Sequence, residues 1–466
     1  MLKLLVAGET GEYFELPDVG AVGRSGSHYT ELIRNDMIKI PDGSTLVYVP
    51  EGVPLGVNEK GDFASVPRDP QSNERLYAIS AILPQGYTRT YLPAYLRPDT
   101  CNPLPLKGYT AVALVDGEVY VAAEKTEEPG HWDPIYYNTD DLERLVKKTI
   151  ADFPRNRIIA HLAHCALEYN CYTAQNIFYR RWEGGIPVSN VCNAHCLGCI
   201  SLQEAPCCPA QERIKFRPGV DEVVELAVHH LTGGEGAVTG TGKGAPEGAG
   251  KGVDPGITKG AVTGTGGGSD IGTTKSAPKG TTKNTIVSFG QGCEGEPSLA
   301  ADIIAPAVKK VRLQTSAGTL NMNTNGGDTA KVLKICSAGL NSIRVSLISA
   351  RAATYEAYTR PKGYGLQNVM DTVKGAREQG VFVAVNLLAM PGLTDTVEEA
   401  EALLEFLSET GVQQLQMRNL NIDPDLLLRV LGKNCPNSEP LGISRLIKIL
   451  REEVPGLVVG SYSKPV

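Results

Sequence analysis

The chain lacks the features that would assign it to a membrane, an export route or a nucleic acid. None of its 466 residues falls in a stretch near the ~18 apolar residues that a membrane-spanning helix needs. The opening sequence MLKLLVAGETGEYFELP has a short apolar run followed by acidic residues, unlike a secretory signal. The net charge of −7 provides no basic excess of the kind that nucleic-acid binding uses. We therefore expect a cytoplasmic protein that does not contact a membrane.

The eleven cysteines do not form the pattern of a disulfide framework. Their number is odd and the chain is long, which favours metal binding or redox chemistry. Cys192, Cys196 and Cys199 lie within the segment VSNVCNAHCLGCIS at a C-x3-C-x2-C spacing. No fourth cysteine lies between them, although structural zinc sites and electron-carrying clusters normally have four protein ligands. Three thiolates can instead hold a [4Fe–4S] cluster and leave one iron open to another molecule.

Three segments of different character follow one another along the chain. Residues 1–135 contain short apolar runs such as STLVYVP and YTAVALV, separated by Gly, Pro, Asn and Asp. This pattern predicts a β-rich domain, which we assign to substrate or partner recognition. Residues 136–183 have helical periodicity and form an expected helical connector, whose first helix ends before Pro154. Strand and helix patterns alternate in residues 184–466.

This alternation predicts six β-α units. The expected strands are residues 186–191, 284–289, 319–324, 342–348, 381–389 and 412–417. The expected helices are residues 221–231, 301–311, 329–339, 366–380 and 396–411, followed by further helical segments. Parallel strands need such crossovers, so we predict an α/β fold: a partial (β/α)6 TIM-like barrel after a β-rich N-terminal domain. Thr396 and Glu399 predict a capping box, and Gly411 predicts the end of that helix.

Residues 233–283 interrupt this alternation. They contain 17 of the 51 glycines, carry the motif GAVTGTG twice and have no aromatic residue or cysteine. Such a segment buries too little apolar surface to offset its ordering entropy, which predicts a disordered insertion; the alternative is a partner-binding linker. The insertion lies in the connection from the first expected helix to the second expected strand. In a β/α barrel, such helix-to-strand connections lie on the face opposite the active site.

Several motifs of the barrel segment resemble the radical S-adenosylmethionine (radical SAM) superfamily. The cysteine loop, with Leu197 after Cys196, is similar to the cluster loop of that family. The second expected strand leads to GQGCEGEP, in which Gly295, Glu296 and Pro297 resemble the family's Gly-Glu-Pro element. The third ends in NMNTNGG, the fourth reads IRVSLIS and the fifth ends in MPG, each similar to a family element. The resemblance covers about residues 187–418 and does not include residues 1–150.

The resemblance implies a [4Fe–4S] cluster and S-adenosylmethionine as cofactors, and a reductive cleavage that yields a 5′-deoxyadenosyl radical. The expected cluster ligands are Cys192, Cys196 and Cys199. The expected S-adenosylmethionine-binding residues are Gly295 and Glu296 at the methionine end, and Asn325 and Ser346 at the adenosine or ribose end. An electron donor such as flavodoxin or ferredoxin is implied. No motif selects the catalytic residue or the substrate, which is a protein, a peptide, an RNA or a small molecule.

Some residues of the expected strand ends have two interpretations. Asn323 and Asn325 are as typical of turns as of ligand contacts. Arg344 shares a strand face with Ser346 and fits either a structural ion pair or a contact to ribose or carboxylate. Arg418 and the following Asn419 end the sixth strand, where a substrate or adenosine contact is an alternative to a structural role.

The remaining cysteines also leave alternatives. An auxiliary cluster, a redox-active thiol and a buried core thiol all fit the set Cys165, Cys171, Cys207, Cys208 and Cys293. His161 and His164 are three apart on an expected helix and could bind a metal together. Two rival functions follow: an iron–sulfur electron-transfer or sensing protein whose fourth ligand is His195 or Cys208, and a zinc-stabilised binding module. Neither rival requires the Gly-Glu-Pro element.

Overall fold

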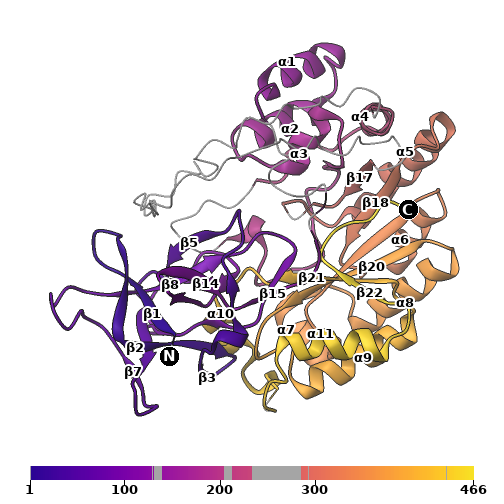
Figure 1. Ribbon diagram of the computed structural model, residues 1–466. Coiled ribbons are helices and arrows are strands. Elements are labelled where there is room, and N and C mark those ends of the chain that lie inside the picture. The colour runs from indigo at the N-terminus through magenta and orange to yellow at the C-terminus, as the bar shows by residue number, and fades with distance from the viewer. Residues whose placement is uncertain are drawn as a thin grey trace.

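The computed structural model describes residues 2–128, 130, 139–203, 212–233, 285–291, 293–436 and 438–466. Figure 1 shows three parts: a β domain, a group of three helices, and a parallel sheet covered by helices. Cys207, Cys208 and the expected insertion, apart from its first residue, lie outside the described residues. None of the helices in the described ranges combines the length and apolar character that crossing a membrane requires.

The N-terminal domain is built from antiparallel strands, which confirms the predicted β-rich region. Strand β2 is the longest and pairs with β1, β3, β6 and β10. The strands are β1 (Lys3–Ala7), β2 (Tyr13–Ser25), β3 (His28–Glu31), β4 (Ile38–Lys39), β5 (Thr45–Tyr48), β6 (Val53–Val57), β7 (Phe63–Ser65), β8 (Tyr77–Ile82), β9 (Tyr87–Arg89), β10 (Leu92–Pro93), β11 (Tyr95–Leu96), β12 (Tyr109–Thr110), β13 (Val112–Val115), β14 (Glu118–Val121) and β15 (Ala123–Lys125).

The connector contains three helices, α1 (Leu142–Asp152), α2 (Arg157–Leu167) and α3 (Tyr172–Tyr179). As predicted, α1 ends before Pro154. The part of the connector after Pro154 is divided into two helices, because Asn170 adopts a left-handed conformation with φ of 50°. The Asn156 side chain begins α2 by accepting a hydrogen bond from the Ile158 amide at 3.2 Å, and it donates to the Glu222 carbonyl at 2.8 Å.

The barrel segment forms one sheet of seven strands, all parallel, in chain order from β16 to β22. This confirms the predicted α/β fold. The strands are β16 (Glu183–Ile186), β17 (Ile286–Phe289), β18 (Thr319–Thr324), β19 (Ser342–Leu347), β20 (Phe382–Ala389), β21 (Gln414–Asn419) and β22 (Val458–Gly460). The helices are α4 (Val220–Leu231), α5 (Ala301–Gln314), α6 (Thr329–Cys336), α7 (Ala352–Thr359), α8 (Leu366–Glu378), α9 (Val397–Thr410), α10 (Pro424–Leu431) and α11 (Ile443–Glu453).

Two local predictions in this segment were wrong, and two elements were missed. The first strand is Glu183–Ile186 rather than residues 186–191, because residues after Ile186 leave the sheet. Strand β22 and helix α7 were not expected. The predicted capping box is absent: the Thr396 hydroxyl donates to the Leu393 carbonyl at 2.9 Å, and Glu399 is buried against Ser349 and Thr354. Gly411, with φ of 64°, ends α9 as predicted.

The inner face of the sheet is polar. Arg344 of β19 forms a buried ion pair with Glu183 of β16, and the Ser288 hydroxyl donates to the same carboxylate at 2.6 Å. Ser463, in the segment after β22, bonds to both charged partners. Burial alone would raise the pKa of Glu183, but Arg344 and the hydroxyl donors hold that pKa below its usual value. The ion pair therefore joins the first and fourth strands with the segment after β22.

The N-terminal domain packs against the carboxyl ends of β20 and β21. The fully buried Arg89 donates to the Leu420 carbonyl at 2.8 Å and to the Ala389 carbonyl at 3.4 Å. Arg24 forms an ion pair with Asp425 of α10 at 2.6 Å, and α10 lies against the β domain in Figure 1. In a parallel sheet, the carboxyl ends of the strands form the edge where ligands bind.

Candidate functional site

The loop that carries the three cysteines follows β16 at the carboxyl edge of the sheet. Its backbone is attached to α7: the amides of His195 and Leu197 each donate at 3.1 Å, to the carbonyls of Thr359 and Tyr358 respectively. A side chain on Gly198 would collide with the Tyr358 hydroxyl, since a Cβ there would lie 2.6 Å from it. Helix α7, which the sequence pattern did not reveal, therefore holds this loop in place.

The three thiols of the loop lie close enough together to influence one another. All three residues are half-buried. Burial raises the pKa of Cys196 to about 12, and the neighbouring Cys192 and Cys199 raise it further. An Arg213 guanidinium nitrogen lies 3.8 Å from the Cys199 sulfur. Three soft donors beside a cation suit an iron–sulfur cluster, because deprotonated thiolates are the ligands such clusters need.

The three thiols do not point to a common metal position. Within the described ranges, no three Cys, His, Asp or Glu side chains surround a common metal position. This includes the cysteine loop, so its thiols must rotate about their side-chain bonds to bind a cluster. His195, considered above as a fourth ligand, has an exposed side chain.

Gly295 allows the two loops at this edge to meet. A Cβ at this position would lie 2.0 Å from the Val191 carbonyl oxygen, so only glycine permits the contact. The Gly295 amide donates to the Ser189 carbonyl at 2.9 Å, and the next amide, that of Glu296, donates to Val191 at 2.8 Å. The group that approaches Gly295 most closely is thus the backbone of the cysteine loop.

Glu296 connects the ends of β17 and β18. Its carboxylate is only 3% exposed and accepts hydrogen bonds from the Asn325 amide at 2.8 Å and the Thr324 hydroxyl at 2.5 Å. It also accepts from the Ser298 amide at 3.0 Å. Burial raises the pKa of Glu296, although these hydrogen bonds lower it in part. Glu296 therefore positions the strand end that carries Asn325.

Asn325 and Ser346 lie at the same edge but in different surroundings. The Asn325 side chain donates to the Asn193 side chain of the cysteine loop at 2.7 Å, and it accepts from the Gly327 amide at 2.9 Å. The turn interpretation of Asn325 is thus observed, together with a contact to the cysteine loop. Ser346 is exposed and lies opposite Asn386 of β20. The structural interpretation of Arg344 is observed too, as the ion pair with Glu183.

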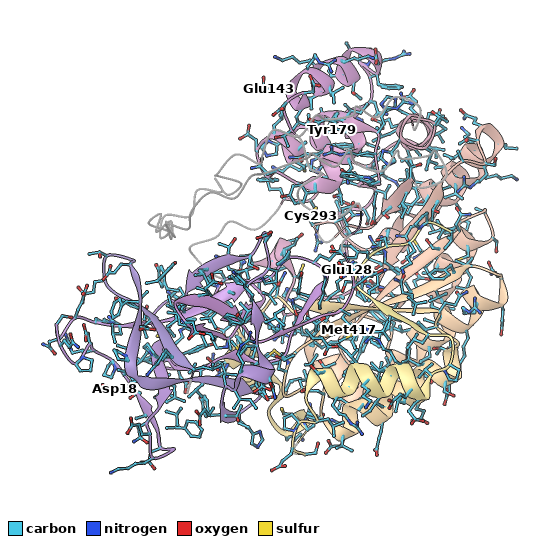
Figure 2. All side chains as sticks on the ribbon, viewed as in Figure 1. Asp18, Glu128, Glu143, Tyr179, Cys293 and Met417 are labelled. Atoms are coloured by element: carbon cyan, nitrogen blue, oxygen red, sulfur yellow. The ribbon has the colours of Figure 1, made fainter. Side chains whose placement is uncertain are left out.

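A cavity of about 330 Å³ lies between the cysteine loop and the ends of β20 and β21. It contains Arg418 and Asn419, which the sequence singled out together. Burial lowers the pKa of Arg418 to about 10, and the nearby Arg344 lowers it further. Figure 2 marks Met417, another lining residue, where the β domain meets the barrel. The lining residues are Leu83, Pro84, Gln85, Gly86, Tyr87, Gly198, Ile200, Tyr358, Leu388, Met417, Arg418, Asn419, Leu420 and Asn421.

Part of this cavity comes from residues that sequence reasoning missed. The segment Leu83–Tyr87 runs from the end of β8 to the first residue of β9, in the N-terminal domain. Asn419 holds it there, because its side chain donates to the Tyr87 carbonyl at 2.9 Å and accepts from the Arg89 amide at 2.9 Å. Contacts over more than 300 residues leave no local pattern, so nothing in the sequence indicated them.

A second group of thiols lies beside the cysteine loop. The Cys165 sulfur lies 3.6 Å from the Nε2 atom of His161, and the Cys171 amide donates to the Cys165 carbonyl at 3.0 Å. Burial raises the pKa of Cys293, and the nearby Glu294, Cys171 and Cys165 raise it further. Burial likewise raises the pKa of Cys165 to about 11. Three of the five cysteines that the sequence left unassigned are thus close enough to one another for electrostatic interaction.

A family sequence model matches part of the barrel segment. Residues 275–407 match the sequence model of the Radical SAM superfamily, a stretch that begins after the cysteine loop. Among curated proteins, no sequence matches this chain. A solved structure of methylornithine synthase (PylB) is similar at 13% identity with a TM-score of 0.34, over 69% of this chain and 71% of that chain.

Other solved structures are similarly distant. HydG, a maturase of the [FeFe]-hydrogenase, has 13% identity and a TM-score of 0.34, over 69% of this chain and 63% of that one. SuiB from Streptococcus suis, bound to the precursor peptide SuiA, has 12% identity and a TM-score of 0.34, over 69% and 66%. The match to residues 275–407, which include β17 to β20 of the parallel sheet, identifies a radical SAM domain in this part of the chain, and enzymes of that superfamily use a [4Fe–4S] cluster and S-adenosylmethionine.

Proposed function

We propose that the protein cleaves S-adenosylmethionine reductively at a [4Fe–4S] cluster held by Cys192, Cys196 and Cys199. The observation that carries this proposal is the attachment of a three-thiol loop to the Gly295–Glu296 segment at the carboxyl edge of a parallel sheet. A cluster that only carries electrons normally has four protein thiolates, whereas three thiolates leave one iron of a [4Fe–4S] cluster open to another ligand. When bound, the cofactors supply a 5′-deoxyadenosyl radical.

The residues around the loop would bind and orient the cofactor. Gly295 and Glu296 lie on the methionine side, where Glu296 fixes the loop backbone and adds negative charge beside an ammonium group. Asn325 bonds to the cysteine loop through Asn193, and this bond supports a role for Asn325 between the cluster and the adenosine. Ser346 has an exposed hydroxyl at the end of β19, free to donate to a ribose.

The cavity at the ends of β20 and β21 would hold the substrate. It lies beside the cysteine loop at Gly198 and Ile200, so a group bound there is next to the cluster. Its other wall is Leu83–Tyr87, which supports the assignment of substrate recognition to the N-terminal domain. A volume of about 330 Å³ admits a small molecule or one side chain of a peptide. We further propose a cytoplasmic enzyme that receives electrons from a flavodoxin or ferredoxin.

The test is an anaerobic assay that needs no knowledge of the substrate. The protein is reconstituted with iron and sulfide, mixed with S-adenosylmethionine and dithionite, and analysed for 5′-deoxyadenosine and methionine. We expect both products from the unmodified protein and from Cys101→Ala, a half-exposed thiol of the N-terminal domain. Cys196→Ala should give neither.

A second measurement applies if the protein cleaves S-adenosylmethionine only when its substrate is present. S-Adenosylmethionine should change the electron paramagnetic resonance signal of the reduced cluster, because it would bind the open iron. A full, reducible cluster that gives no product and no spectral change would refute the proposal and favour an electron carrier.

A further inference from the structure

Arg418 is the one charged residue among the described residues that line the cavity beside the cysteine loop. It is the penultimate residue of β21, so it lies at the carboxyl edge, where ligands of a parallel sheet bind. Tyr358 and Gly198 belong to the same lining, next to the thiols. None of the steps proposed above uses the charge of this arginine.

Arg418 forms no ion pair within the described ranges. Burial lowers the pKa of Arg418 to about 10, so the guanidinium is still charged at neutral pH. The two carboxylates that favour its charged form, those of Glu183 and Glu127, already have other cations. Arg344 is the partner of Glu183, and Lys464 lies 3.0 Å from Glu127. A buried charge without a counter-ion is costly, and a ligand that brings a negative charge would offset that cost.

A row of side chains on β21 orients the guanidinium. Gln414, Gln416 and Arg418 alternate along the strand and therefore share one face of the sheet. Arg418 donates to the Gln416 side chain at 2.7 Å, and Gln416 donates to the Gln414 side chain at 3.2 Å. Gln414 in turn donates to the Tyr462 carbonyl at 2.9 Å. The row occupies one N–H donor of the five in a guanidinium, and the others suit the two oxygens of a carboxylate.

The lining of the cavity fits a carboxylate on an apolar body. One positive charge balances one carboxylate, whereas a phosphate monoester carries about −1.5 to −2 at neutral pH. Two of the three amide side chains in the lining, those of Gln85 and Asn419, already bond to the protein itself, so few groups remain for the backbone of a peptide. The volume of about 330 Å³ is at the lower end of small-molecule cavities. The apolar side chains of the lining include Leu83, Ile200, Leu388, Met417 and Leu420.

We infer that Arg418 binds the carboxylate of the substrate, and that this substrate is a small monocarboxylic acid with an apolar body. The inference rests on the proposed function only in naming this ligand the substrate. S-Adenosylmethionine has a carboxylate of its own, but its methionine end is assigned to Gly295 and Glu296, which follow β17. In the sheet, β18, β19 and β20 separate that strand from β21.

The experiment measures binding to the full chain by fluorine NMR with a matched pair of probes. Trifluorohexanoate, with its fluorine atoms on the terminal carbon, presents a carboxylate on an apolar body, and trifluorohexanamide has a similar shape without the charge. We expect the acid to bind at least about tenfold more tightly than the amide. Arg418→Gln should remove this difference. Arg429→Gln, at a half-exposed arginine of α10 that pairs with Asp99, should preserve it.

The same titrations can overturn the inference. Equal affinities of acid and amide for the unmodified protein would show that the cavity does not recognise the charge, and this comparison needs no variant to fold. An unchanged preference for the acid in an Arg418→Gln variant with native circular dichroism would place the charge recognition elsewhere. Displacement of the acid by inorganic phosphate at lower concentrations than by unlabelled hexanoate would indicate a site for a phosphate group instead.

The reconstituted protein distinguishes the two sources of a carboxylate. In Arg418→Gln, S-adenosylmethionine should still change the electron paramagnetic resonance signal of the reduced cluster. Loss of that response in this variant alone would assign Arg418 to the carboxylate of the cofactor and overturn the inference. Because the NMR titrations use protein without a cluster, failure of the proposed cleavage would leave their result unaffected.

Discussion

At the scale of single residues, the site depends on one backbone contact. Gly295 and Val191 come from different loops and touch where any side chain would intervene. A methyl group at position 295 would push the cysteine loop away from Asn325 and Glu296. This contact therefore determines whether the thiols remain next to the residues expected to bind S-adenosylmethionine.

Gly295→Ala should reduce cluster incorporation. The added Cβ collides with the Val191 backbone, which cannot move as a flexible side chain can, and overpacking of this kind costs about 1–3 kcal/mol. Iron per chain after reconstitution and the melting temperature of the metal-free protein are the measurements. The control is Gly365→Ala, where the nearest atom to a Cβ, on Glu356, is 3.7 Å away. Equal iron content in both variants would show that the contact is unimportant.

The buried ion pair of the barrel predicts a large loss on breaking it. Glu183→Ala leaves the Arg344 guanidinium buried without its carboxylate, which should lower the free energy of unfolding by about 3–5 kcal/mol. Urea unfolding of the metal-free proteins measures this free energy for the variant and the unmodified chain. Glu143→Ala is the control, because Glu143 is 79% exposed and its pair with Lys147 is worth less than about 1 kcal/mol. Similar losses in the two variants would mean that the Arg344 pair adds little.

At the scale of elements, Asp395 shows how a turn after a strand depends on protonation. Its Oδ1 atom accepts from the Gly392 amide at 2.6 Å, while Oδ2 has no hydrogen-bond partner among the described residues. Burial raises the pKa of Asp395 to about 6, from an ordinary value of 3.8. Gly392 in turn contacts Gly26 of the N-terminal domain.

The folded state therefore holds this proton to a higher pH than the unfolded state. The stability that protonated Asp395 contributes is present below about pH 4 and is lost as the pH rises through about 6. Asp395→Asn should remove this dependence. Between pH 5 and 8, the unfolding free energy of the unmodified protein should fall by about 1–2 kcal/mol relative to that of the variant. Asp371→Asn, at an exposed position, should show the same pH dependence as the unmodified protein. If the unfolding free energy of all three proteins changed with pH in parallel, the pH dependence would not come from Asp395.

Regular periodicity made most elements of the barrel predictable. The expected strand 319–324 coincides with β18, and the long amphipathic helices differ from expectation by only a few residues at their ends. The short elements were missed for a physical reason. Helix α7 has the sequence AATYEAYT, whose few apolar residues do not repeat with a helical period, and β22 has three residues. Both gain their structure from tertiary packing, which no local pattern reports.

The site was predictable to a similar extent. The cysteine spacing and the Gly-Glu-Pro element were visible because they are local. The contacts of Gly295 with Val191 and of Asn325 with Asn193 join segments that are more than 100 residues apart in the chain. Such contacts depend on the order of strands in the sheet, so they appear only once the fold is known.

At the scale of the whole molecule, the N-terminal domain and the barrel should unfold together. Arg89 is fully buried between them and donates to the carbonyls of Tyr109, Leu420 and Ala389. Arg97 and Arg24 reach the start of α10 through Asp423 and Asp425. These contacts are many and buried, which couples the two parts thermodynamically.

Arg89→Ala should uncouple them. Removing the guanidinium leaves a cavity and takes one hydrogen-bond donor away from each of three carbonyls, at a cost of about 2–4 kcal/mol. Hydrogen exchange should become faster in β9 and at the carboxyl ends of β20 and β21, while the centre of α5 stays protected. Arg34→Ala, on an exposed turn of the same domain, is the control. Uniform exchange changes across the whole chain, or none, would argue against a role for Arg89 at this junction.

The cavity between Leu83–Tyr87 and Met417–Asn421 has a consequence for how the protein can evolve. In the proposed function this cavity holds the substrate, so a change of substrate would alter the shape required of both walls, yet each wall is encoded more than 300 residues from the other. A mutation in one wall then selects for a compensating mutation in the other. Among descendants of this gene, the two segments should covary, and recombination that exchanges only one of them should yield enzymes with mismatched specificity.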